Sequence, residues 1–284
     1  MKTKPTKKKT GIIKETNAKY HSYMEAVSKS RLSKMSVCPA YFKWCEENPQ
    51  EPTEDLIFGS AFHKAVLEPK TFDKEFCVLP CSFDKRTKAG KEAYNEFLMS
   101  HKGKDIITQE QFDTIIAMKN AIQKNKTVKI LLKGEKETSM YYTDDLTGVE
   151  CKIRPDIFTV VGERLVITDL KSCKSASAED FMRDVVKYSY DLQVAMYKIG
   201  VSKTLNIPIE NIDFVFVAVE KKAPYLTAVY EANEDIFNRG EANYRKYLGM
   251  FKQCKETGDW YEYNGFTHAP MILGLPDYLT KNKN

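Results

Sequence analysis

The spacing of apolar and polar residues changes near position 135. Before that point apolar residues recur every three or four positions, which is typical of amphipathic helices. Pro39 is expected to break or kink the first helix, because proline lacks an amide hydrogen. This part of the chain is predicted to form one short strand at 74–79 and helices over 28–44, 55–67, 91–100 and 108–125.

From Glu135 onward the period becomes two, which indicates strands. The pattern predicts consecutive strands at 136–143, 148–160 and 164–172. It then predicts one or two helices over 178–203, strands at 211–219 and 224–231, and a helix at 234–256. Strands in the middle with helices on both sides predict an α/β domain with a central mixed β-sheet flanked by helices.

Positive charge is concentrated at the start of the chain. Six lysines precede the first acid, Glu15, and the rest of the chain carries 38 basic and 39 acidic side chains. The lysine-rich start is typical of a disordered, solubilising end, with a phosphate-contacting arm as the alternative. We expect a flexible basic segment over 1–27, a folded domain over 28–258 and an irregular tail over 259–284. A nucleic-acid partner would need a local basic face on that nearly neutral domain.

Cysteine usage and hydropathy indicate the compartment. The chain has seven cysteines, and an odd number argues against a disulfide framework. No apolar run approaches the roughly 18 residues that cross a bilayer. The first ten residues hold five lysines and lack the apolar core of a secretory signal. We therefore expect a cytoplasmic protein with no membrane partner.

Two neighbouring predicted strands carry acids that could meet. One contains Arg154-Pro155-Asp156 and the next contains Asp169-Leu170-Lys171. Residues i and i+2 of a strand project from the same face, so Asp169 and Lys171 should project together. Asp156 can lie beside them if Pro155 marks a strand end or bulge. Two close carboxylates repel, and Mg²⁺, or Mn²⁺ in its place, would resolve the conflict. The alternative is an ordinary exposed ion pair.

Three further residues could complete such a site. Gln193 and Tyr197 are spaced i, i+4 on a predicted helix and share one face, which could alternatively pack on the sheet. His63 follows Gly59-Ser60-Ala61, a small-residue run that would let a helix approach closely. Its neutral ring could be a third metal ligand beside Asp156 and Asp169, although a lone histidine is more often structural.

This constellation is suited to cutting a phosphodiester. A bound divalent ion would polarise the phosphate and help to generate hydroxide. Lys171 would position the attacking water or neutralise charge that develops on phosphorus. Gln193 could orient a metal-bound water, and Tyr197 could donate to a phosphate oxygen.

Taken together, the motifs resemble the PD-(D/E)xK nuclease superfamily, and within it the phage-type exonuclease VIII (RecE-like) group, related to lambda exonuclease and the RecB nuclease domain. The resemblance covers about residues 28–200. The matching segments stand in the family's order: Phe58 to His63, Ile153 to Asp156, Thr168 to Lys171, and Gln193-x-x-x-Tyr197. One departure is that the second acid is Asp169 where many members have Glu.

The resemblance implies a single restriction-endonuclease-like domain and a Mg²⁺-dependent exodeoxyribonuclease. Such an enzyme degrades linear double-stranded DNA from its ends, 5′ to 3′, and leaves 3′ single-stranded tails for recombination. It also implies a ring-shaped trimer or tetramer and a single-strand annealing protein as partner. By matching position, metal would be bound by His63, Asp156 and Asp169, with Lys171 catalytic and Gln193 and Tyr197 in support. Glu150 shares a strand face with Asp156 but receives no role.

A basic loop near residue 86 is a candidate DNA contact. Lys85, Arg86 and Lys88 could bind phosphates, or they could form a solvated charge run. Two rival functions stay open for the chain. One is an endonuclease of the same fold, of repair or restriction type, and the other is a non-catalytic DNA-binding protein.

Overall fold

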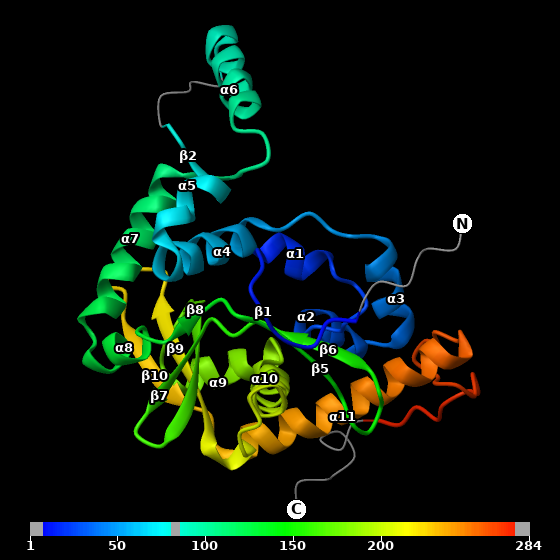
Figure 1. The fold of residues 1–284 in the computed structure, drawn as a ribbon. Coiled ribbons are helices and arrows are strands. Elements are labelled where there is room, and N and C mark those ends of the chain that lie inside the picture. The colour runs from blue at the N-terminus through cyan, green and yellow to red at the C-terminus, as the bar shows by residue number, and fades with distance from the viewer. Residues whose placement is uncertain (1–7, 81–85, 276–284) are drawn as a thin grey trace, which may run out of the picture.

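A five-stranded mixed sheet forms the centre of the protein (Figure 1). The computed structural model describes residues 8–80 and 86–275. The strand order is β10-β9-β8-β7-β4, with β8 and β9 parallel and the other pairs antiparallel. The strands are β4 (Glu135–Lys136), β7 (Ile157–Val161), β8 (Arg164–Cys173), β9 (Ile212–Glu220) and β10 (Thr227–Glu231). The predicted α/β class with a mixed sheet is confirmed.

Both faces of this sheet are covered by helices. Successive side chains of a strand point to opposite faces. Leu165 and Ile167 therefore join the core beneath α9 (Ala178–Lys187), α10 (Tyr190–Leu205) and α11 (Glu234–Thr257). Val166 and Leu170 join the core on the other face, beneath α4 (Glu54–Leu67), α7 (Gln109–Lys124) and α8 (Lys126–Leu131). Burial on both faces explains why β9 reads as a nearly continuous apolar run.

A second, three-stranded sheet has the order β1-β5-β6. Its strands are β1 (Gly11–Ile13), β5 (Ser139–Thr143) and β6 (Glu150–Ile153). The predicted strands 136–143 and 148–160 are therefore each divided between the two sheets. The first breaks at Glu137, whose φ of 50° lies in the left-handed region. The second breaks at residues 154–156, where Pro155 has no amide hydrogen to donate to a ladder.

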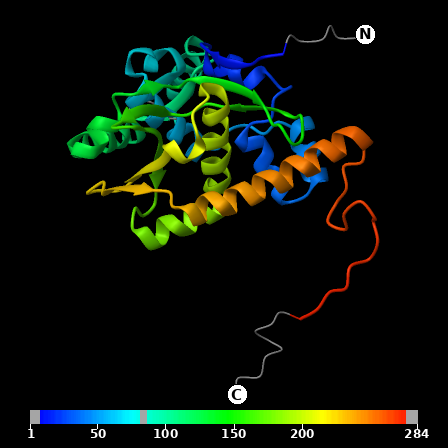
Figure 2. The same cartoon turned by 60° about the horizontal axis from the view of Figure 1, so that its bottom comes forward.

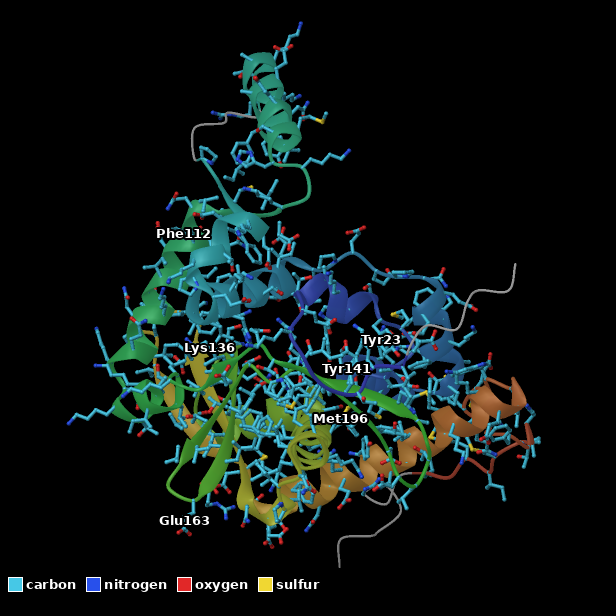
Figure 3. The ribbon with its side chains drawn as sticks, viewed as in Figure 1. Tyr23, Phe112, Lys136, Tyr141, Glu163 and Met196 are labelled. Atoms are coloured by element: carbon cyan, nitrogen blue, oxygen red, sulfur yellow. The ribbon has the colours of Figure 1, made fainter. Side chains whose placement is uncertain are left out.

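The described part of the N-terminal segment, for which the sequence pattern predicted flexibility, contains a strand and a helix. β1 pairs with β5, and Thr16 caps the helix α1 (Asn17–Ser22). Tyr20 and Tyr23 are buried, and the ring of Tyr23 meets that of Tyr141 edge-on at 5.5 Å (Figure 3). Apolar burial against a distant strand holds this segment, and local sequence patterning does not reveal such contacts.

Pro39 divides the first predicted helix, as expected. It produces α2 (Lys29–Leu32), a 3₁₀ turn (Ser33–Ser36) and α3 (Pro39–Glu47). Pro39 occupies the first turn of α3, where its missing amide hydrogen costs nothing. Short 3₁₀ turns also occur at Pro69–Thr71 and Ile209–Asn211.

One helix projects from the body. After α5 (Phe72–Glu75), the parallel strands β2 (Phe76–Leu79) and β3 (Asp105–Thr108) are connected through α6 (Lys88–Ser100). None of the residues of α6 is buried, and the helix stands away from the sheets (Figure 1). β3 was not predicted from the sequence.

The C-terminal part follows the long helix α11. Gly258, with a φ of 78°, ends this helix, and residues 258–275 contain no helix or strand. The ring of Trp260 stacks on Phe42 of α3 at 5.5 Å, and the chain then leaves the body (Figure 2). Within the described ranges, no helix combines the length and the apolarity that crossing a membrane requires.

Candidate active site

The acids Asp156 and Asp169 meet where β7 begins beside β8. Ile157 of β7 pairs with Thr168 of β8, so Asp156 lies just before β7 and next to Asp169. Beyond Thr168, β8 continues beside β9 as far as Cys173. Asp169 lies within β8 and not at its end. β8 loses its neighbour on one side there, because β7 begins at Ile157 and the chain before it belongs to the second sheet.

A cleft of about 760 Å³ opens over these acids. Its lining includes His63 from α4, Lys171 from β8, and Gln193 and Tyr197 from α10. The sequence placed these residues on separate elements without showing that α4 and α10 face one another. Five of the six predicted catalytic and metal-binding residues line this cleft, and the sixth, Asp169, is buried against two of them, Lys171 and Gln193.

Asp156 is anchored by backbone and histidine. Its Oδ2 accepts a hydrogen bond from the Leu170 amide at 2.8 Å and lies 3.3 Å from His63 Nδ1. Burial acts to raise the pKa of Asp156, but His63 and Lys171 outweigh burial and lower it. Burial likewise acts to lower the pKa of His63, but Asp156 raises it to about 9. The imidazolium therefore balances the charge of Asp156.

Asp169 is almost fully buried and is held by two side chains. Its Oδ1 accepts from Gln193 Nε2 at 2.6 Å, and its Oδ2 forms an ion pair with Lys171 Nζ without an aligned hydrogen bond. Lys171 also donates to Gln193 Oε1 at 3.2 Å. Burial and the charge of Asp156 raise the pKa of Asp169, while Lys171 opposes the rise. Gln193 thus fixes both the acid and the lysine.

Tyr197 holds the backbone beside the acids. Its hydroxyl donates to the carbonyl oxygen of Arg154 at 3.4 Å. Burial raises the pKa of Tyr197 well above its usual value, so the phenol stays neutral. This contact braces the turn that carries Asp156.

Glu137 belongs to the site and was missed in the sequence. A ligand atom from each of His63, Glu137 and Asp156 lies within 4.8 Å of the others. Arg154 Nε donates to Glu137 Oε2 at 2.7 Å, and the Glu137 amide donates to the Asp156 carbonyl at 3.0 Å. Burial, followed by the charge of Asp156, raises the pKa of Glu137. No local motif marks this residue, because its left-handed backbone breaks what otherwise reads as one strand.

Two sequence interpretations need correction. A Cβ added to Gly59 would meet nothing within 4 Å, and Gly59 lines the cleft. This glycine therefore keeps the cleft wall open and does not serve close helix packing. Glu150 lies on β6 of the second sheet, where it accepts a hydrogen bond from Tyr23 Oη at 3.2 Å. It is not among the residues that line the cleft.

Of the three basic residues near position 86, two belong to the part of the chain that the structure describes. Lys85 is outside the described residues. Arg86 is exposed, and Lys88 begins the projecting helix α6, 3.9 Å from Glu92. Neither Arg86 nor Lys88 lines the cleft. DNA contact by these three residues stays a prediction.

The donor set fits a hard divalent cation. Three acids, Glu137, Asp156 and Asp169, gather here, and their charge is balanced by His63, Lys171 and Arg154. Carboxylate oxygens with one imidazole are suitable ligands for such an ion. The close cluster contains Glu137 where the sequence suggested Asp169. Coordination by Asp169 stays a prediction.

The ion pair between His63 and Asp156 predicts a pH dependence of stability. A histidine with a raised folded pKa stabilises fully below its unfolded pKa, near 6.5, and loses that contribution as pH rises through about 9. In EDTA, the free energy of unfolding of wild type should exceed that of His63→Gln by at most about 3 kcal/mol at pH 6. Chemical denaturation should show this difference shrinking between pH 6.5 and 9. A difference in unfolding free energy that stays constant over this pH range would show that the ion pair between His63 and Asp156 does not form.

The fold and the site together define a PD-(D/E)xK-type domain. A family model described as a PDDEXK-like domain of unknown function (DUF3799) matches residues 28–268. The chain therefore belongs to this family, and with it to the PD-(D/E)xK nuclease superfamily. Among curated proteins, none matches the chain.

Solved structures support the same fold. One described as "Putative exonuclease" from Eubacterium rectale matches with a TM-score of 0.63 and 16% identity, covering 94% of this chain and 98% of that one. A second, SSO0001, has a TM-score of 0.28 and 14% identity over 66% and 85% of the two chains. The second carries no weight at that score. The superfamily and the first neighbour support a nuclease.

Proposed function

We propose that the protein is a divalent-metal-dependent exodeoxyribonuclease that degrades linear double-stranded DNA from its ends. The observation that carries this proposal is that Asp156 and Lys171 line one cleft, while Asp169 is buried beside Lys171 and Gln193 contacts both of these residues. An acid pair with an adjacent lysine supplies metal ligands and a positive charge at the same point. One solved structure that the chain matches is described as a "Putative exonuclease", which is the class of nuclease that acts at chain ends.

The residues take separate roles in this proposal. Asp156, Asp169, His63 and Glu137 would hold Mg²⁺, with Mn²⁺ as a substitute. When bound, the ion supplies Lewis-acid activation of the phosphate and of water. His63 must release its proton to act as a ligand, since only the neutral ring has a free lone pair. Lys171 places its ammonium where charge builds on phosphorus, and Gln193 keeps it there.

The finer proposal follows the resemblance to the exonuclease VIII group. Digestion would run 5′ to 3′ and leave 3′ tails that a single-strand annealing protein receives for recombination. A ring-shaped trimer or tetramer would surround the DNA, with Lys85, Arg86 and Lys88 as phosphate contacts. The nuclease domain would span about residues 28–258.

The experiment that tests the function compares linear and closed circular DNA. We expect a linearised plasmid to be digested with Mg²⁺ and the closed circle of the same sequence to stay intact. EDTA should abolish digestion, since the acids cannot bind a phosphate without the cation. Products are measured on end-labelled duplex, with 5′-phosphate and 5′-hydroxyl ends compared for polarity.

Cutting of the closed circle at a similar rate would favour the endonuclease. Binding of DNA without cutting in any divalent ion would favour the non-catalytic protein. Gel filtration with light scattering measures the oligomeric state independently of activity.

A further inference from the structure

Lys171 has a third partner that the motif does not contain. Its Nζ lies 4.5 Å from the ring centroid of Tyr190, the first residue of α10. The ammonium of Lys29 lies over the same ring at 5.4 Å and donates to the Tyr188 carbonyl at 2.8 Å. Distances below about 6 Å allow a cation to be attracted by the negative face of an aromatic ring.

The first turn of α10 presents both neutral partners of Lys171. Ser189, with a φ of 52°, separates α9 from α10 and places Tyr190 at the start of the new helix. Tyr190 and Gln193 are three residues apart and therefore lie on one helix face. Gln193 contacts the ammonium through its amide oxygen, and Tyr190 contacts it through its ring.

The contact between Lys171 and the Tyr190 ring matters most when Asp169 binds a metal cation. Asp169 forms an ion pair with Lys171. An Asp169 carboxylate that also binds a metal cation attracts Lys171 less strongly, because its charge is shared between the two. The contacts to Tyr190 and Gln193 do not depend on that charge. They can therefore hold the ammonium of Lys171 in place with or without a cation on Asp169.

We propose that Tyr190 is a positioning residue that holds Lys171 in the cleft through the face of its ring. This inference rests on the proposed nuclease function for its catalytic consequence, but the contact itself does not. Lys29 shares the ring, and burial together with the charge of Lys171 lowers the pKa of Lys29 to about 8. The charges of the Lys29 and Lys171 ammonium groups therefore act on each other beside the Tyr190 ring.

The test compares Tyr190→Leu, which removes the ring, with Tyr190→Phe, which keeps it. We expect kcat on linear duplex to fall about tenfold in Tyr190→Leu and to stay within about twofold of wild type in Tyr190→Phe. KM for DNA and the Kd for Mn²⁺ should change less than about twofold in both, because neither DNA nor metal ligands are removed. Tyr247→Leu is the matched control, since Tyr247 packs on the same core from α11 and does not line the cleft.

A second readout needs no activity. In metal-free protein with ¹³C-methylated lysines, the Lys171 signal, assigned by its loss in Lys171→Met, should be shifted upfield by the ring of Tyr190. The shift should vanish in Tyr190→Leu and persist in Tyr190→Phe. An unchanged Lys171 signal in Tyr190→Leu, or equal loss of kcat in both variants, would overturn the inference. A wild-type protein that cuts no DNA would defeat the proposed function, while the signal would still decide the contact.

Discussion

Replacing Lys171 by Met, or Asp169 by Asn, is expected to lower the rate of DNA digestion by about a thousandfold or more. Lys171 is the ammonium beside the acids, and Asp169 is almost fully buried between it and Gln193. Either change removes charge from the reacting centre and leaves a buried partner unbalanced. The measurement is release of labelled nucleotides from linear duplex with saturating Mg²⁺.

Folding must be separated from chemistry in these variants. Both variants should still unfold in one cooperative transition in EDTA and bind DNA in Ca²⁺, although the unbalanced buried group lowers their thermal stability. Lys246→Met, an exposed lysine on α11, is the matched control and should keep full activity. Full activity in Lys171→Met or Asp169→Asn would show that the proposed active site is wrong.

Gly240→Ala is expected to destabilise the protein by about 3 kcal/mol or more. A Cβ at this position would lie 1.9 Å from the backbone oxygen of Asp191. This clash can be relieved only if one of the two backbones moves. Gly240 lies in α11 and Asp191 in the first turn of α10, so the added methyl would push these helices apart. The free energy of unfolding from urea titration measures the effect.

The matched control is Gly249→Ala in the same helix. A Cβ there would meet nothing within 4 Å, so the gain in helix propensity should dominate and stabilise by about 0.5–1 kcal/mol. Equal effects of the two substitutions would show that helix propensity, and not the close approach of α10, decides the role of Gly240.

Local pattern was enough to predict most of the helices and strands and to place the candidate site residues on them. The alternation around Asp169 and Lys171 placed them on one face of a strand, and β8 with its core neighbours confirms this arrangement. The spacing of Gln193 and Tyr197 placed both on one helix face, which lines the cleft. These features depend on neighbours within a few residues, and the sequence states such neighbours directly.

Long-range partners were not visible in the same way. The sequence did not show that β1 pairs with β5, that β8 runs parallel to β9, or that α4 faces α10 across the cleft. Tyr190 reads as an ordinary helix residue until its ring is placed beside Lys171.

The sequence by itself determined the α/β class, the acid–lysine pair on β8 and the break at Pro39, because each is encoded by residues close together in the chain. Only the tertiary structure decided that Glu137 joins His63 and Asp156, and that Gly59 opens the cleft. Glu137 enters the site through a left-handed residue at the point where the chain passes between two sheets. Such a position is fixed by the packing of distant segments, and no periodicity in the sequence records it.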